Sequence, residues 1–120
     1  MKTVLIADDK ATSRELVRTV LENSGYAVVE AGDGIEALRS ARESKPDLII
    51  LDLHMPGMDG FEVVREIRLD PDLASTPVMA LTASAMQGDR ERALSAGFTS
   101  YIAKPIHLSE LRSEVERMLH

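Results

Sequence analysis

The chain has 120 residues, no cysteine, and 14 Lys and Arg against 20 Asp and Glu, which gives a formal net charge of −6. The lack of cysteine excludes disulfides, thiolate metal sites and cysteine nucleophiles, and the acidic composition argues against nonspecific nucleic-acid binding, which needs cationic residues to displace counterions. No apolar stretch approaches the roughly 20 residues of a membrane span. We therefore expect one domain over residues 1–120, large enough to bury its own core, in the cytoplasm and with neither nucleic acid nor membrane as a partner.

Strand-like and helix-like segments alternate along the whole chain. Five short runs rich in aliphatic or β-branched residues predict strands over Thr3–Ala7, Ala27–Ala31, Leu48–Leu53, Pro77–Thr82 and Thr99–Ala103. The segments between and after them predict helices over Ala11–Asn23, Ile35–Ser44, Gly60–Leu69, Met86–Ser95 and Leu108–Leu119. Five strand–helix units of this kind are typical of an α/β protein in which helices cover both faces of a parallel sheet.

Local signals mark several helix ends. Pro46 and Pro71 are expected to end the second and third helices, because the residue before a proline is pushed out of the α region. Asp59, directly before Gly60, is expected to cap the third helix. Asp33, between two glycines, is interpreted as a turn residue.

Polar side chains gather where the predicted strands end. Asp8 and Asp9 follow the first strand, Asp52 lies at the end of the third, and Thr82 and Lys104 end the fourth and fifth. Because ligands of parallel sheets bind beyond the carboxyl ends of the strands, we expect these groups at one edge. Three close carboxylates repel one another unless one is protonated or a cation lies among them, and oxygen-only donors suit Mg²⁺. A metal beside a lysine favours phosphoryl transfer to a carboxylate.

A structural interpretation competes for each aspartate taken singly, because aspartates at strand ends commonly cap helices or close turns. The Asp8–Asp9 pair favours a function, since a second adjacent carboxylate adds cost without improving a cap. Other enzyme classes fit less well. His54 stands where haloacid-dehalogenase-type phosphatases carry a second aspartate, and the chain has neither GxGxxG nor GxxxxGK[ST].

Four segments carry a resemblance to a known family. They are Asp8-Asp9, the run LDLHMPGMDG over residues 51–60, Thr82-Ala83 and Lys104-Pro105. Together they resemble the receiver domain of bacterial response regulators, the CheY-like family, over all five strand–helix units. The resemblance implies a doubly wound, flavodoxin-like and CheY-like sheet with strand order 2-1-3-4-5. It also implies a phosphoacceptor of two-component phosphorelay signalling that assists its own phosphorylation and dephosphorylation, rather than an enzyme.

The resemblance further implies a role for each matching residue. Asp52 would accept the phosphoryl group. Asp9 and Asp52 would ligate Mg²⁺ directly, with Mn²⁺ as a substitute, while Asp8 would bind through water and His54 would add its backbone carbonyl. The groups that contact the phosphoryl oxygens would be Thr82, Lys104 and the backbone of Ala83.

A switch and two partner surfaces are implied as well. In the family, a threonine moves toward the phosphoryl group and an aromatic residue of the fifth strand rotates inward; Thr82 and Tyr101 match these positions. The Lys104–Pro105 bond is expected to be cis, and the positions of His54 and Ser84 are those that tune phosphoryl lifetime.

The implied partners are proteins. The donor would be a sensor histidine kinase or a histidine phosphotransfer protein, docking around Ser13, Leu16, Met55, Pro105 and Ile106. A downstream protein target would bind the face formed by the fourth helix, fifth strand and fifth helix, which includes Gln87, Arg90, Tyr101 and Ile106.

Several alternatives remain open at this point. No output domain is expected after Leu119-His120, and the chain is either a free-standing regulator, which Met1 directly before the first strand favours, or a receiver excised from a hybrid histidine kinase or larger regulator. A degenerate receiver that only mediates protein contacts is disfavoured by the complete set of site residues. A phosphohydrolase acting on outside substrates would need a substrate pocket that no motif identifies.

Overall fold

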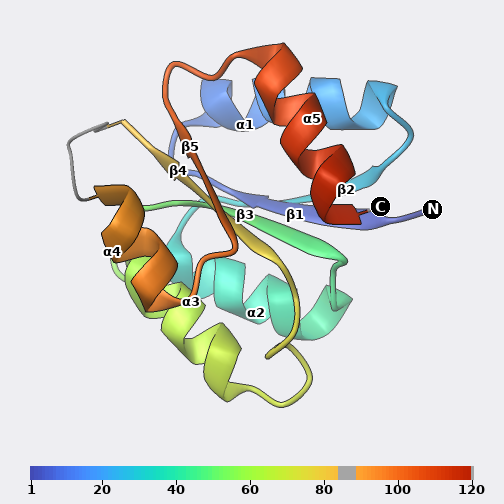
Figure 1. The fold of residues 1–120 in the computed structure, drawn as a ribbon. Coiled ribbons are helices and arrows are strands. Elements are labelled where there is room, and N and C mark those ends of the chain that lie inside the picture. The colour runs from blue at the N-terminus through green and yellow to red at the C-terminus, as the bar shows by residue number, and fades with distance from the viewer. Residues whose placement is uncertain (84–88, 120) are drawn as a thin grey trace.

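The structure, a computed structural model, describes residues 1–83 and 89–119, in which five strands alternate with five helices. The strands are β1 (Thr3–Ala7), β2 (Ala27–Ala31), β3 (Leu48–Asp52), β4 (Val78–Thr82) and β5 (Ser100–Ala103). The helices are α1 (Ala11–Asn23), α2 (Gly34–Ser44), α3 (Gly60–Leu69), α4 (Asp89–Ala96) and α5 (Leu108–Leu119). All strand pairs are parallel and the order is β2-β1-β3-β4-β5 (Figure 1), which confirms the implied fold.

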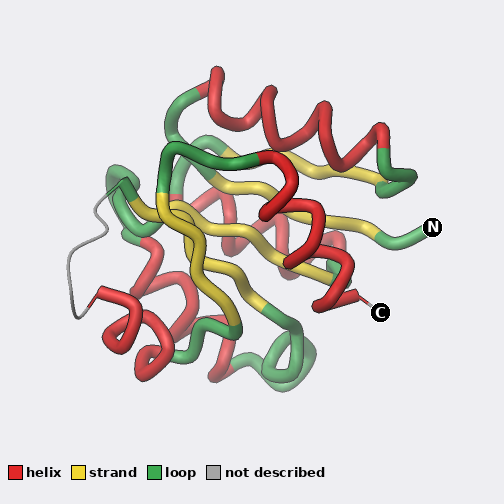
Figure 2. Tube along the Cα trace, turned by 45° about the horizontal axis from the view of Figure 1, so that its top comes forward, coloured by secondary structure: helices red, strands yellow, loops and turns green. Residues whose placement is uncertain are grey.

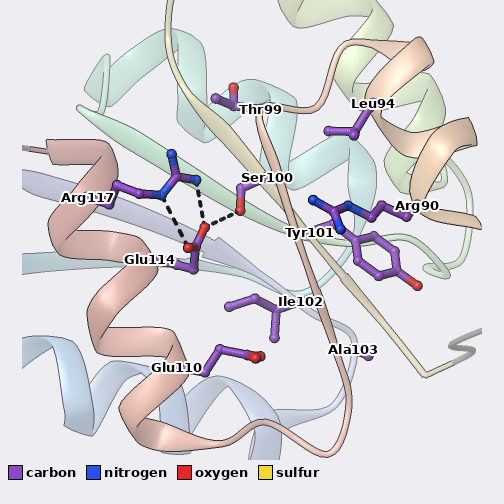
Figure 3. Close-up of a pocket in the computed structure, with 10 residues that line it drawn as sticks. All are labelled: Arg90, Leu94, Thr99, Ser100, Tyr101, Ile102, Ala103, Glu110, Glu114 and Arg117. Atoms are coloured by element: carbon purple, nitrogen blue, oxygen red, sulfur yellow. Dashed lines mark hydrogen bonds and ion pairs between the residues drawn. The ribbon is translucent and has the colours of Figure 1, made fainter.

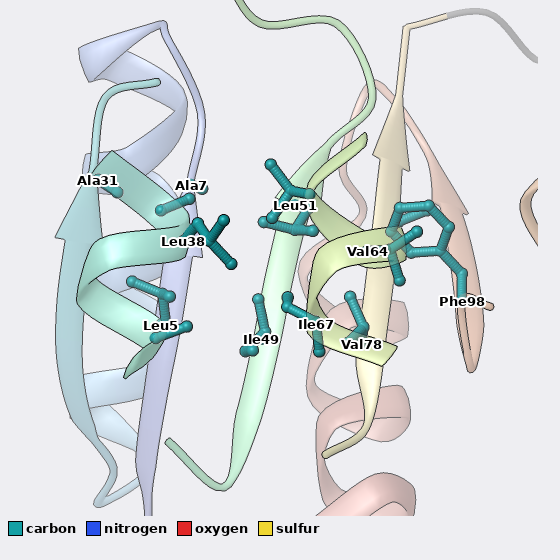
Figure 4. Close-up of a cluster of buried hydrophobic side chains, with 14 of the residues drawn as sticks. Leu5, Ala7, Ala31, Leu38, Ile49, Leu51, Val64, Ile67, Val78 and Phe98 are labelled. Carbon is teal, nitrogen blue, oxygen red and sulfur yellow. The ribbon is translucent and has the colours of Figure 1, made fainter. Parts of the chain in front are cut away.

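The sheet separates two layers of helices. Helices α1 and α5 cover one face, and α2, α3 and α4 cover the other, as both views show (Figure 1 and Figure 2). Successive strand residues alternate between the layers: Leu5 packs in the cluster beneath α2 and α3 (Figure 4), and Ile6 in the cluster beneath α1 and α5. Because both faces are covered, β3 and β4 are buried along their whole length, which explains the apolar run without alternation in β3.

The bounds of the elements differ from the predicted ones by single residues. Strand β3 ends at Asp52 instead of Leu53, and β4 and β5 each begin one residue later than predicted. Pro77 lies outside β4 because it has no N–H to donate, although its carbonyl accepts a hydrogen bond from Ile49 N–H over 3.0 Å. Helix α4 is described only from Asp89, so the predicted helical residues 86–88 lie outside the described residues.

Helix ends follow local chemistry with one correction. The side chain of Asp33 accepts a hydrogen bond from Glu36 N–H, so this residue is the N-cap of α2 and not merely a turn residue. Asp59 caps α3 as predicted, in a reciprocal capping box with Glu62. Lys45, before Pro46, leaves the helix in a left-handed conformation with φ of 45°. The longest described helix has 13 residues, and none in the described ranges is long and apolar enough to cross a membrane.

Candidate functional site

The carboxyl ends of four strands meet at one edge of the sheet. The register of β1 against β3 places Asp8, which follows β1, beside Asp52, the last residue of β3. The register of β4 against β5 brings Thr82 next to Lys104, whose backbone N–H donates a hydrogen bond to the Thr82 carbonyl over 2.6 Å. Residues far apart in the sequence therefore lie together at the carboxyl edge of the sheet, as the alternation of strands and helices predicted.

Three carboxylates form a cluster at this edge. Asp8, Asp9 and Asp52 each present an oxygen atom, and these atoms all lie within 4.8 Å of one another. Asp8 is fully buried and Asp52 is 4% exposed, whereas Asp9 is exposed to solvent. Clustered carboxylate oxygens without sulfur or imidazole ligands are the donors that Mg²⁺ prefers, so these residues fit a hard divalent cation.

Lys104 bridges the two buried carboxylates. Its Nζ atom lies 2.9 Å from Asp8 Oδ2 and 3.2 Å from Asp52 Oδ2. The remaining oxygen of each carboxylate accepts a backbone N–H, from Lys10 to Asp8 Oδ1 over 2.9 Å and from His54 to Asp52 Oδ1 over 3.1 Å. One ammonium therefore pairs with two buried carboxylates and can balance only one of their charges, so the cluster keeps an excess of negative charge.

The environment of the cluster shifts two pKa values. Burial raises the pKa of Asp52, and the charge of Asp8 adds to this rise; the hydrogen bond from His54 N–H and the ammonium of Lys104 oppose it without cancelling it. Burial disfavours the charged form of Lys104, but its hydrogen bonds to the two carboxylates and their charges outweigh burial and raise its pKa. Lys104 therefore stays an ammonium at neutral pH.

Other predicted site residues occupy the same edge or the face beside it. Thr82 is buried at the end of β4 and Ala83 follows it, exposed. Tyr101 of β5 is half-buried and packs against the cluster beneath α2 and α3. The Lys104–Pro105 peptide bond is cis. Ser84 and Gln87 lie outside the described residues.

The predicted docking surface for the donor needs one correction. Leu16 on α1 is 43% exposed and Pro105 is also exposed, as a docking surface requires. Met55, however, is only 8% exposed and belongs to the core beneath α2 and α3. The side chain of Met55 packs in that core and therefore offers little surface to a docking partner, contrary to the prediction.

Two residues near the acidic cluster were not predicted to matter. Arg14 of α1 donates a hydrogen bond from Nη1 to the backbone carbonyl of Asp8 over 2.7 Å. Gly60 begins α3 so close to β3 that a Cβ atom there would lie 2.7 Å from the Asp52 carbonyl oxygen. The sequence signal for Gly60 was its place one residue after a capping aspartate, and for Arg14 only its place early in a helix that follows the acidic pair.

Comparison with known proteins identifies the family. The family model for the response regulator receiver domain matches residues 4–116. The chain belongs to the response regulator receiver family. Receiver domains are signalling proteins of two-component systems that obtain phosphoryl groups from histidine kinases and act on downstream partners.

Individual relatives resemble this receiver over nearly its whole length. It is 39% identical over 118 residues to the polar-differentiation response regulator DivK of Brucella anthropi, covering 98% of this chain and 96% of that protein. The chemotaxis protein CheY4 of Vibrio cholerae is 34% identical with a TM-score of 0.93, covering 99% of each chain. The receiver domain of sensor histidine kinase PA1611 from Pseudomonas aeruginosa is 37% identical with a TM-score of 0.91, covers 98% and 97% of the two chains, and holds a magnesium ion in its active-site cleft.

Proposed function

We propose that this receiver accepts a phosphoryl group on Asp52 from a histidine-phosphorylated donor, either a sensor histidine kinase or a histidine phosphotransfer protein. One observation carries the proposal. Asp52 is a buried carboxylate at the sheet edge, held by Lys104 Nζ and one backbone N–H, in a cluster with more negative charge than its own lysine can neutralise. Such an arrangement suits a nucleophile whose product gains charge and acceptor oxygens.

The transfer is a displacement at phosphorus. A carboxylate oxygen of Asp52 attacks and forms a P–O bond while the P–N bond of the donor phosphohistidine breaks, and the departing imidazole keeps the electron pair of that bond. Lys104 Nζ, within 3.2 Å of Asp52 Oδ2, donates a charge-assisted hydrogen bond to an oxygen of the transferred group. The hydroxyl of Thr82 and the backbone N–H of Ala83 would bind the other oxygens.

The acidic cluster would hold Mg²⁺, with Mn²⁺ as a substitute. Asp9 and Asp52, together with the His54 backbone carbonyl, are the proposed direct ligands. Asp8, which is fully buried and whose oxygens accept hydrogen bonds from Lys10 N–H and Lys104 Nζ, would act through water. When bound, the cation supplies positive charge that stabilises the transferring oxygens.

The face formed by α4, β5 and α5 is the proposed output surface. A depression of about 690 Å³ lies between α4 and α5 over the outer edge of β5 (Figure 3), lined by Arg90, Leu94, residues 99–103, Glu110, Glu114 and Arg117. Tyr101 lies in this depression and Thr82 at the phosphoryl site, so a coupled movement of the two side chains would transmit phosphorylation to a protein bound there. The charged rim and the partly exposed Leu94 suit a protein partner.

Intact-mass spectrometry after treatment with acetyl phosphate tests the phosphoacceptor. With Mg²⁺ present we expect one added phosphoryl group on wild type, and none when a chelator removes the cation. Asp52→Asn should gain none, because its side chain is a neutral amide and no longer a nucleophilic carboxylate. Asp59→Asn is the matched control in the same loop, since asparagine also caps helices, and it should be phosphorylated like wild type.

Two results would contradict the proposal. An equal adduct on Asp52→Asn would assign the phosphoryl group to another residue. The lack of any adduct on wild type, with both acetyl phosphate and a phosphorylated histidine phosphotransfer protein, would make this chain a receiver that acts only through protein contacts.

A further inference from the structure

Arg14 contacts the backbone of the acidic cluster. Its Nη1 donates to the Asp8 carbonyl over 2.7 Å, and its Nε donates to Glu30 Oε1 of β2 over 3.3 Å. The Arg14 side chain is 22% exposed, so both contacts are partly shielded from water. A hydrogen bond from a guanidinium is stronger than one from a neutral donor. Arg14 therefore holds the peptide group that joins two carboxylate residues of the cluster.

That peptide group sets the direction of Asp9. A peptide group is planar, so a fixed Asp8 carbonyl also fixes the N–H and Cα positions of the next residue. The Asp8 N–H is held on its other side by the Ala31 carbonyl over 3.2 Å. The Asp9 side chain, in contrast, makes no hydrogen bond or ion pair with any described residue. The place of its carboxylate therefore depends on the backbone that Arg14 restrains.

The charge of Arg14 is compensated where it lies. Glu30 accepts from Arg14 with one oxygen and from Arg18 Nη1 with the other over 2.9 Å, and Arg18 also pairs with Glu22 over 3.2 Å. Two cations and two anions thus form a ladder along α1 and β2. Because Glu30 balances the guanidinium, Arg14 can restrain the backbone without adding an unpaired positive charge beside a cation site.

We infer that Arg14 is a positioning residue of the acidic cluster, which holds the Asp8–Asp9 peptide group so that these carboxylates and Asp52 can share one divalent cation. This inference rests on the proposed function, because it presumes that the cluster binds Mg²⁺. A residue that merely attached α1 to β2 would contribute to stability and leave cation affinity unchanged. The two roles are therefore separated by a binding measurement.

Isothermal titration of the metal-free proteins with MgCl₂ is the test, on wild type, Arg14→Gln and Arg18→Gln. We expect the Mg²⁺ dissociation constant of Arg14→Gln to rise on the order of tenfold, as when other residues that orient metal ligands are removed. Arg18→Gln removes two ion pairs of the same ladder but no contact with Asp8, and should stay within about twofold of wild type. Both variants make the net charge more negative by one, which alone would strengthen cation binding.

Arg14→Lys keeps the charge and is a second test variant, which can be measured if Arg14→Gln does not fold. A lysine lacks the planar fork that reaches Glu30 and the Asp8 carbonyl together, so we expect weakened Mg²⁺ binding here too. Equal affinity in wild type and both Arg14 variants, or an equal loss in Arg18→Gln, would overturn the positioning role while leaving the cation site intact. If wild type does not bind Mg²⁺, the cation site proposed above fails and this inference fails with it.

Discussion

Asp8 and Asp52 are buried carboxylates that share a single ammonium, that of Lys104, as their charged partner among the described residues. Burying a carboxylate without full compensation is costly, and the raised pKa of Asp52 expresses that cost. A chain selected only for stability would gain by removing one of these charges. The surplus negative charge therefore favours a function for the cluster over a structural role.

Glu114 on α5 shows the opposite balance. The hydrogen bond from Arg117 lowers the pKa of Glu114, and the Ser100 hydroxyl, which donates to Oε2 over 2.7 Å, lowers it further (Figure 3). The folded-state pKa thus lies below the ordinary value of 4.5. Ionised Glu114 stabilises the fold at pH values above that ordinary pKa, and the stabilisation disappears as the pH falls through the lowered pKa.

We predict that Glu114→Gln lowers the free energy of unfolding at neutral pH by less than about 1 kcal/mol. The difference from wild type should shrink toward zero as the pH falls through the lowered pKa of Glu114 and the carboxyl becomes protonated. Urea unfolding across this range measures it. Glu116→Gln, at an exposed position with no ion pair to any described residue, is the control and should show no such trend. A Glu114→Gln difference that stays constant with pH would contradict the prediction.

At the scale of elements, α3 begins in direct contact with the backbone of β3. A Cβ atom at Gly60 would lie 2.7 Å from the Asp52 carbonyl oxygen and 2.9 Å from Leu53 Cα, closer than such atoms approach. The capping box of Asp59 holds the first turn of the helix in this position. The first residue of α3 therefore packs directly against the backbone of the proposed phosphoacceptor, Asp52.

We predict that Gly60→Ala destabilises the fold by about 1–3 kcal/mol, because overpacking against backbone outweighs the better helix propensity of alanine. Urea unfolding measures the loss. Gly32→Ala is the control, since its Cβ would meet only Arg14 Nη1 at an ordinary 3.6 Å, and it should change stability by less than about 0.5 kcal/mol. Wild-type stability in Gly60→Ala would show that α3 can move away from β3 without cost.

Arg68 joins α3 to the two segments that precede β4 and β5. Its guanidinium donates to four acceptors, the carbonyls of Gly97, Ala74 and Thr76 at 3.0, 3.0 and 2.6 Å and the Thr99 hydroxyl at 3.3 Å. Burial lowers its pKa, since no carboxylate among the described residues pairs with it. Arg68 thereby attaches α3 to the segments before β4 and β5. It does so through carbonyl groups that only a planar guanidinium can reach together.

Arg68→Lys should therefore cost about 2 kcal/mol of unfolding free energy, through hydrogen bonds lost and carbonyls left without partners. Amide hydrogen exchange at Thr99, whose N–H donates to the Val78 carbonyl over 2.7 Å, should accelerate as the contact loosens. Arg65→Lys, exposed on the same helix, should leave both measurements unchanged. Equal exchange in Arg68→Lys and wild type would contradict the attachment.

For the whole molecule, the two-layered packing brings the ends of strands from distant parts of the chain to one edge, and the acidic cluster forms only in the folded state. A cation bound there stabilises the fold because the unfolded chain has no comparable site. Mg²⁺ at ten times its dissociation constant should stabilise wild type by about 1.4 kcal/mol. Asp9→Ala should stay folded and lose nearly all of this response.

Asp52→Asn completes that comparison. Since folding raises the pKa of Asp52, its charged form destabilises the folded state at neutral pH, and the neutral amide should make the protein more stable than wild type in chelator. It should also gain less from Mg²⁺. Urea unfolding of the three proteins, with chelator and with excess Mg²⁺, provides the measurement. An equal response of wild type and Asp9→Ala would show that these carboxylates form no cation site.

The sequence by itself determined the order and type of the elements and the membership of the acidic cluster. Periodicity, capping and turn chemistry depend on neighbours a few residues apart, which is why α1, α5 and the Asp59 cap are found where predicted. The convergence of Asp8, Asp52 and Lys104 also followed, because a parallel sheet collects the carboxyl ends of its strands at one edge. The roles of these residues stay predictions until the phosphoryl and Mg²⁺ measurements are made.

Only the tertiary structure decided which atoms meet between elements. The contact of Arg14 with the Asp8 carbonyl, the close approach of Gly60 to β3 and the burial of Met55 each depend on how a helix or loop is placed against the sheet. Sequence periodicity does not predict that placement. The groups that these residues contact are backbone atoms, which every residue has, or core positions that many apolar residues could fill. Local signals therefore name the parts of the site, and packing between distant segments sets the geometry in which those parts act.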